Sequence, residues 1–256
     1  MNVLRGLGFV WIALMFSGYS LAASTSTIDD VLVASGFTRH MDRVPAEGAK
    51  ALSQSIEQLS GAAMPRMVNG VIGNQLQQWW SPASLKASLT QDLARTLSDM
   101  DARALLAWFK SPEGAAVTHA EVQSGHAAVG GVSNQKAYSD ERLAIARRID
   151  QHIGVSALAI FMQEATVQGL HSYGVKSGSS KSRPSPQVVE RRVARQLADT
   201  YHQLPDSTLV AYEAFLGSES AAKFHGSVQR VLKAEYQDGL RAMLNDVGPM
   251  LAMFLR

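Results

Sequence analysis

The chain has 256 residues, of which 46% are apolar and 18% are charged, and its formal net charge is +2 at pH 7. This balance is typical of a globular protein with enough apolar material for one large or two small domains. It excludes a basic nucleic-acid-binding surface on the scale of the whole protein. The absence of cysteine excludes disulfides and lipid attachment at cysteine, so the fold depends on its core alone.

The first 23 residues are typical of an export signal. Arg5 supplies a short basic region, and residues 6–22 carry no charge and are rich in large apolar side chains. Small-residue patterns end this stretch, so we expect cleavage near Ala22 or Ala23 and a periplasmic or secreted mature protein. An uncleaved anchor is the alternative. No later stretch is long and apolar enough to span a membrane, so we expect no transmembrane segment in the mature chain.

The remaining sequence has helical periodicity and no useful β-alternation, which predicts an all-α helical bundle. Pro45 and Pro82 open helices, and Gly70 interrupts one. Glycines after residue 124 predict a loop up to Tyr138. In the first half we predict helices over residues 28–34, 46–59, 71–80, 82–97, 99–110 and 112–124.

In the second half, Ser139 begins a long predicted helix that continues to Met162, with Gly154 as the point of a bend. Residues 174–185 are rich in glycine, serine and lysine, which is typical of a flexible linker. The dipeptide at 248–249, Gly-Pro, predicts the end of the last helix. The other predicted helices cover residues 186–203, 206–216 and 218–244.

The segment from Leu97 to Gly114 predicts two helices joined at a tight corner. Ser98 and Asp101 have the spacing of a capping box, in which each side chain bonds the backbone N–H of the other residue. Ser111 and Pro112 predict a second helix start, because serine accepts from free N–H groups and proline sacrifices no hydrogen bond there. The residues that we expect to be structural are Ser98, Asp101, Phe109, Ser111, Pro112, Gly114 and Phe215.

An altered copy of this corner occupies residues 204–222. Each copy carries an aromatic residue and then a glutamate, and a histidine follows each copy. The aligned pairs are Phe109 and Phe215, Glu113 and Glu219, and His119 and His225. We therefore predict two related helical units over residues 24–135 and 139–256, with the linker at 174–185 inside the second. The sequence leaves open whether the units pack together or form tandem domains.

The run Leu-Leu-Ala-Trp-Phe-Lys-Ser-Pro-Glu-Gly at residues 105–114 resembles the signature of a family of exported bacterial proteins, catalogued as domain of unknown function 2059. That family typically has an acidic helix start, an aromatic pair and then Ser-Pro-x-Gly. Residues 31–36 are also similar to its first helix. The resemblance implies an exported helical protein, and it implies no reaction and no catalytic residue.

No motif predicts a metal site, a cofactor or an activated nucleophile. None of the seven histidines pairs with another at helical spacing, and His119 and His126 lie too far apart along one helix for one metal ion. There is no Gly-x-Ser-x-Gly, and no glycine-rich phosphate loop follows a strand. Glu113 has a functional interpretation as a catalytic acid, but its neighbours favour a carboxylate at the positive end of a helix.

Two groups of residues are candidates for contact with a partner. A basic cluster in the linker and the next helix suits acidic lipid headgroups, a cell-wall polymer or an acidic protein, and a solvated face is the simpler interpretation. A tryptophan pair before Ser81 suits a partner interface, with burial in the core as the alternative. The candidate interaction residues are Trp79, Trp80, Arg183, Arg191, Arg192 and Arg195.

These observations favour a non-enzymatic interaction or chaperone-like module of the cell envelope, whose partner is an envelope protein or an acidic surface. We expect no nucleic-acid partner, no cofactor and no metal. One alternative is an envelope hydrolase in which residues distant in sequence converge in the folded chain. Another is a carrier of an apolar ligand between the two units. The residues of the hydrolase alternative are Glu113, His119, Glu219 and His225.

Overall fold

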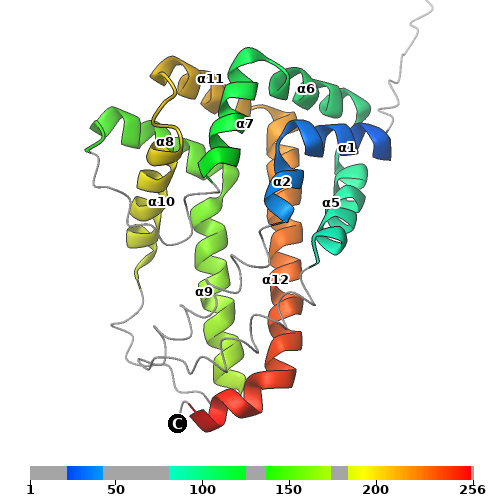
Figure 1. Cartoon of the computed structure of the whole chain (residues 1–256), viewed down its shortest axis with the longest axis vertical. Helices are drawn as coiled ribbons and strands as arrows, with labels where there is room; N and C mark the ends of the chain where they lie inside the picture. The colour runs from blue at the N-terminus through cyan, green and yellow to red at the C-terminus, as the bar shows by residue number, and fades with distance from the viewer. Residues whose placement is uncertain (1–21, 43–80, 125–136, 174–183, 255–256) are drawn as a thin grey trace, which may run out of the picture.

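The computed structural model describes residues 22–42, 81–124, 137–173 and 184–254, with side chains up to residue 249. These residues form α-helices without a strand, which confirms the predicted all-α bundle (Figure 1). Residues 1–21 of the expected signal lie outside the described residues, and so do the helices predicted over residues 46–59 and 71–80. The helices are α1 (Thr25–Ala34), α2 (Phe37–Met41), α5 (Pro82–Thr96), α6 (Asp99–Phe109), α7 (Pro112–Ser124), α8 (Asp140–Ile153), α9 (Val155–Ser172), α10 (Pro186–Thr200), α11 (Asp206–Leu216) and α12 (Glu219–Phe254).

Two clusters of buried apolar side chains form the core. The first cluster lies among α1, α2, α5, α6 and the beginning of α12, and the second lies among α7, α8, α10 and α11. Leu89 in the first cluster and Ile149 in the second are completely buried, and burial of one such side chain contributes about 2 kcal/mol. Trp108 and Phe215 pack against both clusters, so the core is continuous.

The helix α12 comes from the second predicted unit and completes the core of the first. Ala221, Phe224 and Val228 of α12 are buried in the first cluster, and α12 packs against α5 and α6. The described parts of the two predicted units therefore pack together. The helices that carry the aligned segments have equal lengths, 15 residues in α5 and α10 and 11 residues in α6 and α11. The duplication itself stays a prediction.

Serine side chains begin several of the helices. Ser81 Oγ accepts a hydrogen bond from the backbone N–H of Ser84 at 3.0 Å, and Ser139 Oγ accepts from that of Arg142 at 3.2 Å. The first helix begins at Thr25 rather than at residue 28, because Ser24 Oγ accepts from a backbone N–H in the first turn. Side-chain oxygens of this kind satisfy the free donors of a helix start.

The long helix predicted after Ser139 is broken at Gly154 into α8 and α9, which meet at an angle of 60°. Gly154 has a φ of 74°, which residues with a side chain rarely adopt. The carboxylate of Asp150 accepts from the backbone N–H of Ser156 at 3.0 Å and from its hydroxyl at 2.5 Å. Gln229 of α12 donates from Nε2 to the carbonyl oxygens of Ile153 and Gly154 at 2.9 and 3.0 Å. The corner is therefore held by both local and distant groups.

The prediction that the last helix ends at residues 248–249 is wrong, because α12 continues to Phe254. A proline inside a helix costs about 3 kcal/mol, so other interactions must offset Pro249. This part of α12 packs closely on the end of α9: a Cβ on Gly248 would lie 2.5 Å from the Tyr173 ring. The Tyr173 hydroxyl also donates to Asn245 at 2.6 Å. Tertiary packing therefore extends α12 beyond its local stop signal.

The helix α9 and the second half of α12 run side by side as a two-helix arm, and the other described helices gather at one end of the molecule (Figure 1). Thr166 and Tyr236 share a hydrogen bond between the two helices of this arm. No single described helix has the length and apolar character needed to cross a membrane. The bent pair of α8 and α9 meets that criterion only when the two helices are taken together.

Candidate functional site

The first corner contains the predicted capping box. Ser98 Oγ accepts from the backbone N–H of Asp101 at 3.1 Å, and Asp101 Oδ2 accepts from the backbone N–H of Ser98 at 3.0 Å. Two donors that the helix leaves free are thereby satisfied. Asp99, in the same first turn, forms an ion pair with Arg103 one turn later. Both acidic residues therefore have structural roles at the start of α6.

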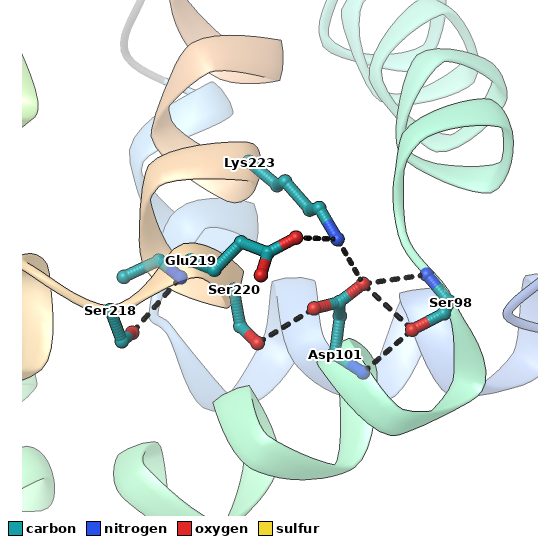
Figure 2. A network of polar contacts seen from close by, with 7 residues as sticks. Ser98, Asp101, Ser218, Glu219, Ser220 and Lys223 are labelled. Atoms are coloured by element: carbon teal, nitrogen blue, oxygen red, sulfur yellow. Dashed lines mark hydrogen bonds and ion pairs between the residues drawn. The ribbon is translucent and has the colours of Figure 1, made fainter. Parts of the chain in front are cut away.

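Asp101 also joins α6 to the beginning of α12, as Figure 2 shows. Its carboxylate accepts from Ser220 Oγ at 2.8 Å and from Lys223 Nζ at 3.0 Å. The residue is only 4% exposed. Lys223 makes a second ion pair with the exposed Glu219 at 2.8 Å. We call Ser98, Asp101, Ser220 and Lys223 the aspartate clamp.

The electrostatics of the aspartate clamp favour the ionised form of Asp101. Burial raises the pKa of this carboxyl group, but the hydrogen bonds from Ser98, Lys223 and Ser220 together lower it more. The pKa is therefore held well below the ordinary value of an aspartate. A carboxylate that stays ionised and is surrounded by donors binds helices together and is a poor proton carrier.

The second half of the corner has a cap and a close contact between helices. Ser111 Oγ accepts from the backbone N–H of Gly114 at 3.0 Å. A Cβ on Gly114 would lie 2.0 Å from the carbonyl oxygen of Trp108, so a residue with a side chain does not fit. Pro112 begins α7, and Glu113 is exposed in its first turn. The Ser-Pro-x-Gly pattern thus has a steric and hydrogen-bonding explanation.

Aromatic rings bring the two aligned corners together. The rings of Phe109 and Phe215 meet edge to face with centroids 5.7 Å apart. Trp108 stacks on Phe215 at 4.6 Å, and Tyr212 lies 6.2 Å from Trp108 in a near-parallel orientation. Contacts of this kind contribute about 1 kcal/mol each beyond the area that they bury. Both phenylalanines were predicted to be structural from the sequence, whereas the central position of Trp108 was not.

A second polar cluster, which was not predicted from the sequence, surrounds Glu121 on α7. The Oε1 atom of half-buried Glu121 accepts from the hydroxyl of Tyr201 at 2.7 Å and from that of Tyr212 at 3.0 Å. The two tyrosines are 1% and 4% exposed. Glu121 follows buried Val117 by one helical turn, and this spacing was the available signal. We call Glu121, Tyr201 and Tyr212 the tyrosine–glutamate cluster.

The electrostatics of this cluster raise the pKa of the Glu121 carboxyl group. Burial raises the pKa of Glu121, and the hydrogen bonds from Tyr201 and Tyr212 offset only part of that effect. Burial, followed by the nearby carboxyl group, raises the pKa of both tyrosines well above 10. Among the described residues, no hydrogen bond or ion pair joins Glu121 to a basic side chain. The cluster therefore holds α7, α10 and α11 together without a compensating positive charge.

The four residues of the hydrolase alternative are not joined to one another by a hydrogen bond or ion pair among the described residues. Glu113 and His119 are exposed on α7, and the Glu219 side chain is 81% exposed on α12. The Nε2 atom of His225 is buried without a partner in the described part of the chain. Burial, with a smaller contribution from His152, lowers the pKa of His225 to about 4. The two aligned histidines thus have opposite environments.

The candidate interaction residues divide into two groups. Arg191, Arg192 and Arg195 are exposed on α10, at a surface that the described helices leave open. Trp79, Trp80 and Arg183 lie outside the described residues.

The described residues contain no group of three or more histidine, aspartate or glutamate side chains arranged to hold a metal ion. No family model, curated protein or solved structure matches this chain.

Proposed function

We propose that this chain is an exported helical protein of the cell envelope that binds a partner and catalyses no reaction of its own. Export is supported by the basic, then apolar, then small-residue pattern of residues 1–23. The partner is an envelope protein or an acidic surface, and the role is that of an interaction or chaperone-like module.

The observation that carries this proposal is the use of the buried carboxyl groups in the described core. Asp101, Asp150 and Glu121 each accept hydrogen bonds from groups that hold helix starts or neighbouring helices in place. A catalytic acid or base needs a free position beside the substrate. In these three groups, donors of the protein itself occupy the space beside the carboxyl oxygens. The exposed arginines of α10, in contrast, can contact an external partner.

A photocrosslinking scan in cells tests the proposal. The full chain carries a photoreactive residue in place of Gln196 on α10, Lys110 at the end of α6, or His119 on α7, which are all exposed. We expect adducts with a component of the envelope, concentrated at one of these surfaces. Absence of adducts at every position would contradict a binding role.

Fractionation of the same cells tests export. We expect the chain outside the cytoplasm, with the mass of a protein that begins at Ala23 or Ser24. An unprocessed chain recovered from the cytoplasm would contradict export. Turnover of ester, peptide or glycosidic substrates by the purified mature chain would contradict the absence of catalysis, provided that the Glu113→Gln and His119→Ala variants lose it.

A further inference from the structure

The helix α10 has one face in the core and the opposite face in solvent. Val189 and Val193 of this helix are buried in the second cluster. Arg191, Arg192 and Arg195 are exposed on the other side. At 3.6 residues per turn, these three positions fall within a sector of about 100° on the helix surface. Figure 1 shows α10 at one side of the molecule, and the burial pattern places this sector in solvent.

The three arginines have no acidic partner among the described residues. Arg191 Nε donates to the carbonyl oxygen of Gln187 at 3.2 Å, which is a neutral group of the same helix. Three other described arginines each form an ion pair with a carboxylate on a neighbouring element. These ion pairs are Arg142 with Asp206, Arg148 with Glu213, and Arg230 with Asp92. The positive charge of α10 is therefore available to an external anion.

The charge of the chain is strongly uneven. Residues 174–195 contain six basic residues and one acidic residue, a net charge of +5, whereas the whole chain carries +2. The rest of the chain therefore carries −3. An anionic surface attracts one part of such a molecule and repels the rest, which selects one orientation of approach.

The composition of the α10 face distinguishes a lipid surface from a protein partner. Specific protein interfaces depend on buried aromatic or aliphatic anchors. The large apolar side chains that are exposed in the described residues, Val33, Met100, Val155 and Val210, all lie on helices other than α10. A surface of anionic headgroups needs no such anchor, because several basic side chains near it suffice.

We propose that the arginine face of α10 docks on an anionic phospholipid surface. This inference rests on the proposed function and names the acidic surface that the protein binds. Binding is peripheral and electrostatic, since the apolar face of α10 is already buried in the second cluster. It therefore weakens as salt screens the charges.

Vesicle sedimentation of the mature full chain tests the proposal. We expect binding to vesicles of phosphatidylcholine mixed with phosphatidylglycerol at low salt, and no binding to phosphatidylcholine alone. The triple variant R191Q/R192Q/R195Q is expected to bind about 100-fold more weakly, which corresponds to about 1 kcal/mol for each arginine. The variant R191K/R192K/R195K keeps the charges and should bind like the original chain.

The matched control is R39Q/R103Q/R241Q, which removes the same charge from exposed positions on other helices. It should retain vesicle binding. All variants alter exposed side chains, and their unfolding midpoints establish that they are folded.

Equal weakening by both glutamine triples would overturn the proposal, because net charge alone would then explain binding. No binding to anionic vesicles would also overturn it. In that case, an envelope protein crosslinked at Gln196 would leave the proposed function intact and assign α10 to an acidic protein instead. No crosslink at any position together with no vesicle binding would reject both.

Discussion

The aspartate clamp and the tyrosine–glutamate cluster both join a carboxyl group to neighbouring helices by hydrogen bonds. They shift the pKa of that carboxyl group in opposite directions. In the clamp, the Lys223 ammonium and the serine donors lower the pKa of Asp101 below the ordinary range. In the cluster, burial raises the pKa of Glu121, and the tyrosine hydroxyls offset only part of it. One molecule therefore contains two environments for a carboxyl group, one that lowers its pKa and one that raises it.

The two arrangements give opposite dependences of stability on pH. The contribution of Asp101 is present above the unfolded pKa of an aspartate, about 4, and is lost as the pH falls through the lowered folded pKa. The contribution of Glu121 is present below the unfolded pKa of a glutamate, also about 4, and is lost as the pH rises through the raised folded pKa. The free energy of unfolding measured against pH therefore distinguishes the two carboxyl groups.

The largest effect is expected from Trp108→Ala, which tests whether the two regions belong to one cooperative core. Removal of this indole should destabilise the protein by about 4 kcal/mol, because a large aromatic side chain leaves a cavity. Since Trp108 packs against both clusters, amide hydrogen exchange should become faster in both α5 and α10. Faster exchange confined to one of these helices would show that the two regions unfold separately.

Asp101→Asn breaks the ionised arrangement. We expect a loss of about 2 kcal/mol in the free energy of unfolding at neutral pH, because a buried acceptor loses its charge-assisted hydrogen bonds. Urea unfolding at decreasing pH should show the variant and the original chain converging as Asp101 becomes protonated. Asp99→Asn, in the same helical turn but with an exposed ion pair, is the control and should change stability by less than about 1 kcal/mol. A constant difference at every pH would refute the assignment of an ionised Asp101.

Glu121→Gln tests the tyrosine–glutamate cluster, in which the pKa of the carboxyl group is raised. The glutamine keeps an acceptor for the tyrosine hydroxyls and cannot ionise, so at acidic pH the two chains should differ by no more than about 1 kcal/mol. As the pH rises, the original chain should lose stability relative to the variant, which is the reverse of the trend for Asp101→Asn. Glu113→Gln, an exposed glutamate of the same helix, should show no such trend. A variant that becomes relatively less stable at high pH would contradict a raised pKa of Glu121.

The smallest effect compares the aligned starts of α5 and α10. Ser81→Ala removes a cap that accepts from a backbone N–H and should cost about 1 kcal/mol. Ser185 makes no side-chain cap hydrogen bond, so Ser185→Ala should cost only a few tenths of a kcal/mol, at most about 0.5. Thermal unfolding of the two variants checks the difference. Equal losses would show that the two helix starts are equivalent in energy as well as in sequence.

Local signals in the sequence predicted the helix starts well. Ser98, Ser111 and Ser139 cap the helices that follow them, because capping involves only residues three positions apart. The bounds of α5, α6, α7 and α11 accordingly lie within a residue of the predicted ranges.

The polar groups that hold the helices together were not predictable in the same way. Asp101 was expected to cap its own helix, but its bonds to Ser220 and Lys223 reach across the fold. The hydroxyl groups on Glu121 likewise come from two other helices. Helical periodicity indicates which face of a helix is buried and carries no information about which distant donor meets it.

Two interruptions of the helical pattern depend on contacts beyond the local sequence. The bend predicted at Gly154 is present and is a complete break between α8 and α9, where Asp150 and Gln229 satisfy the exposed backbone groups. Pro249 was expected to end α12, but packing on α9 keeps the helix going. In both cases tertiary contacts decided the outcome of an ambiguous local signal.

The hydrogen bonds of Gln229 fix the position of the break at Gly154 relative to α12. The backbone at Gly154 sets the angle between α8 and α9. The hydrogen bonds from the Gln229 amide hold that corner beside one position along α12. The axis of α9 is thus aimed along a helix that is distant in sequence. The Gln229 side chain, in the first third of α12, therefore fixes the place at which the corner between α8 and α9 meets that helix.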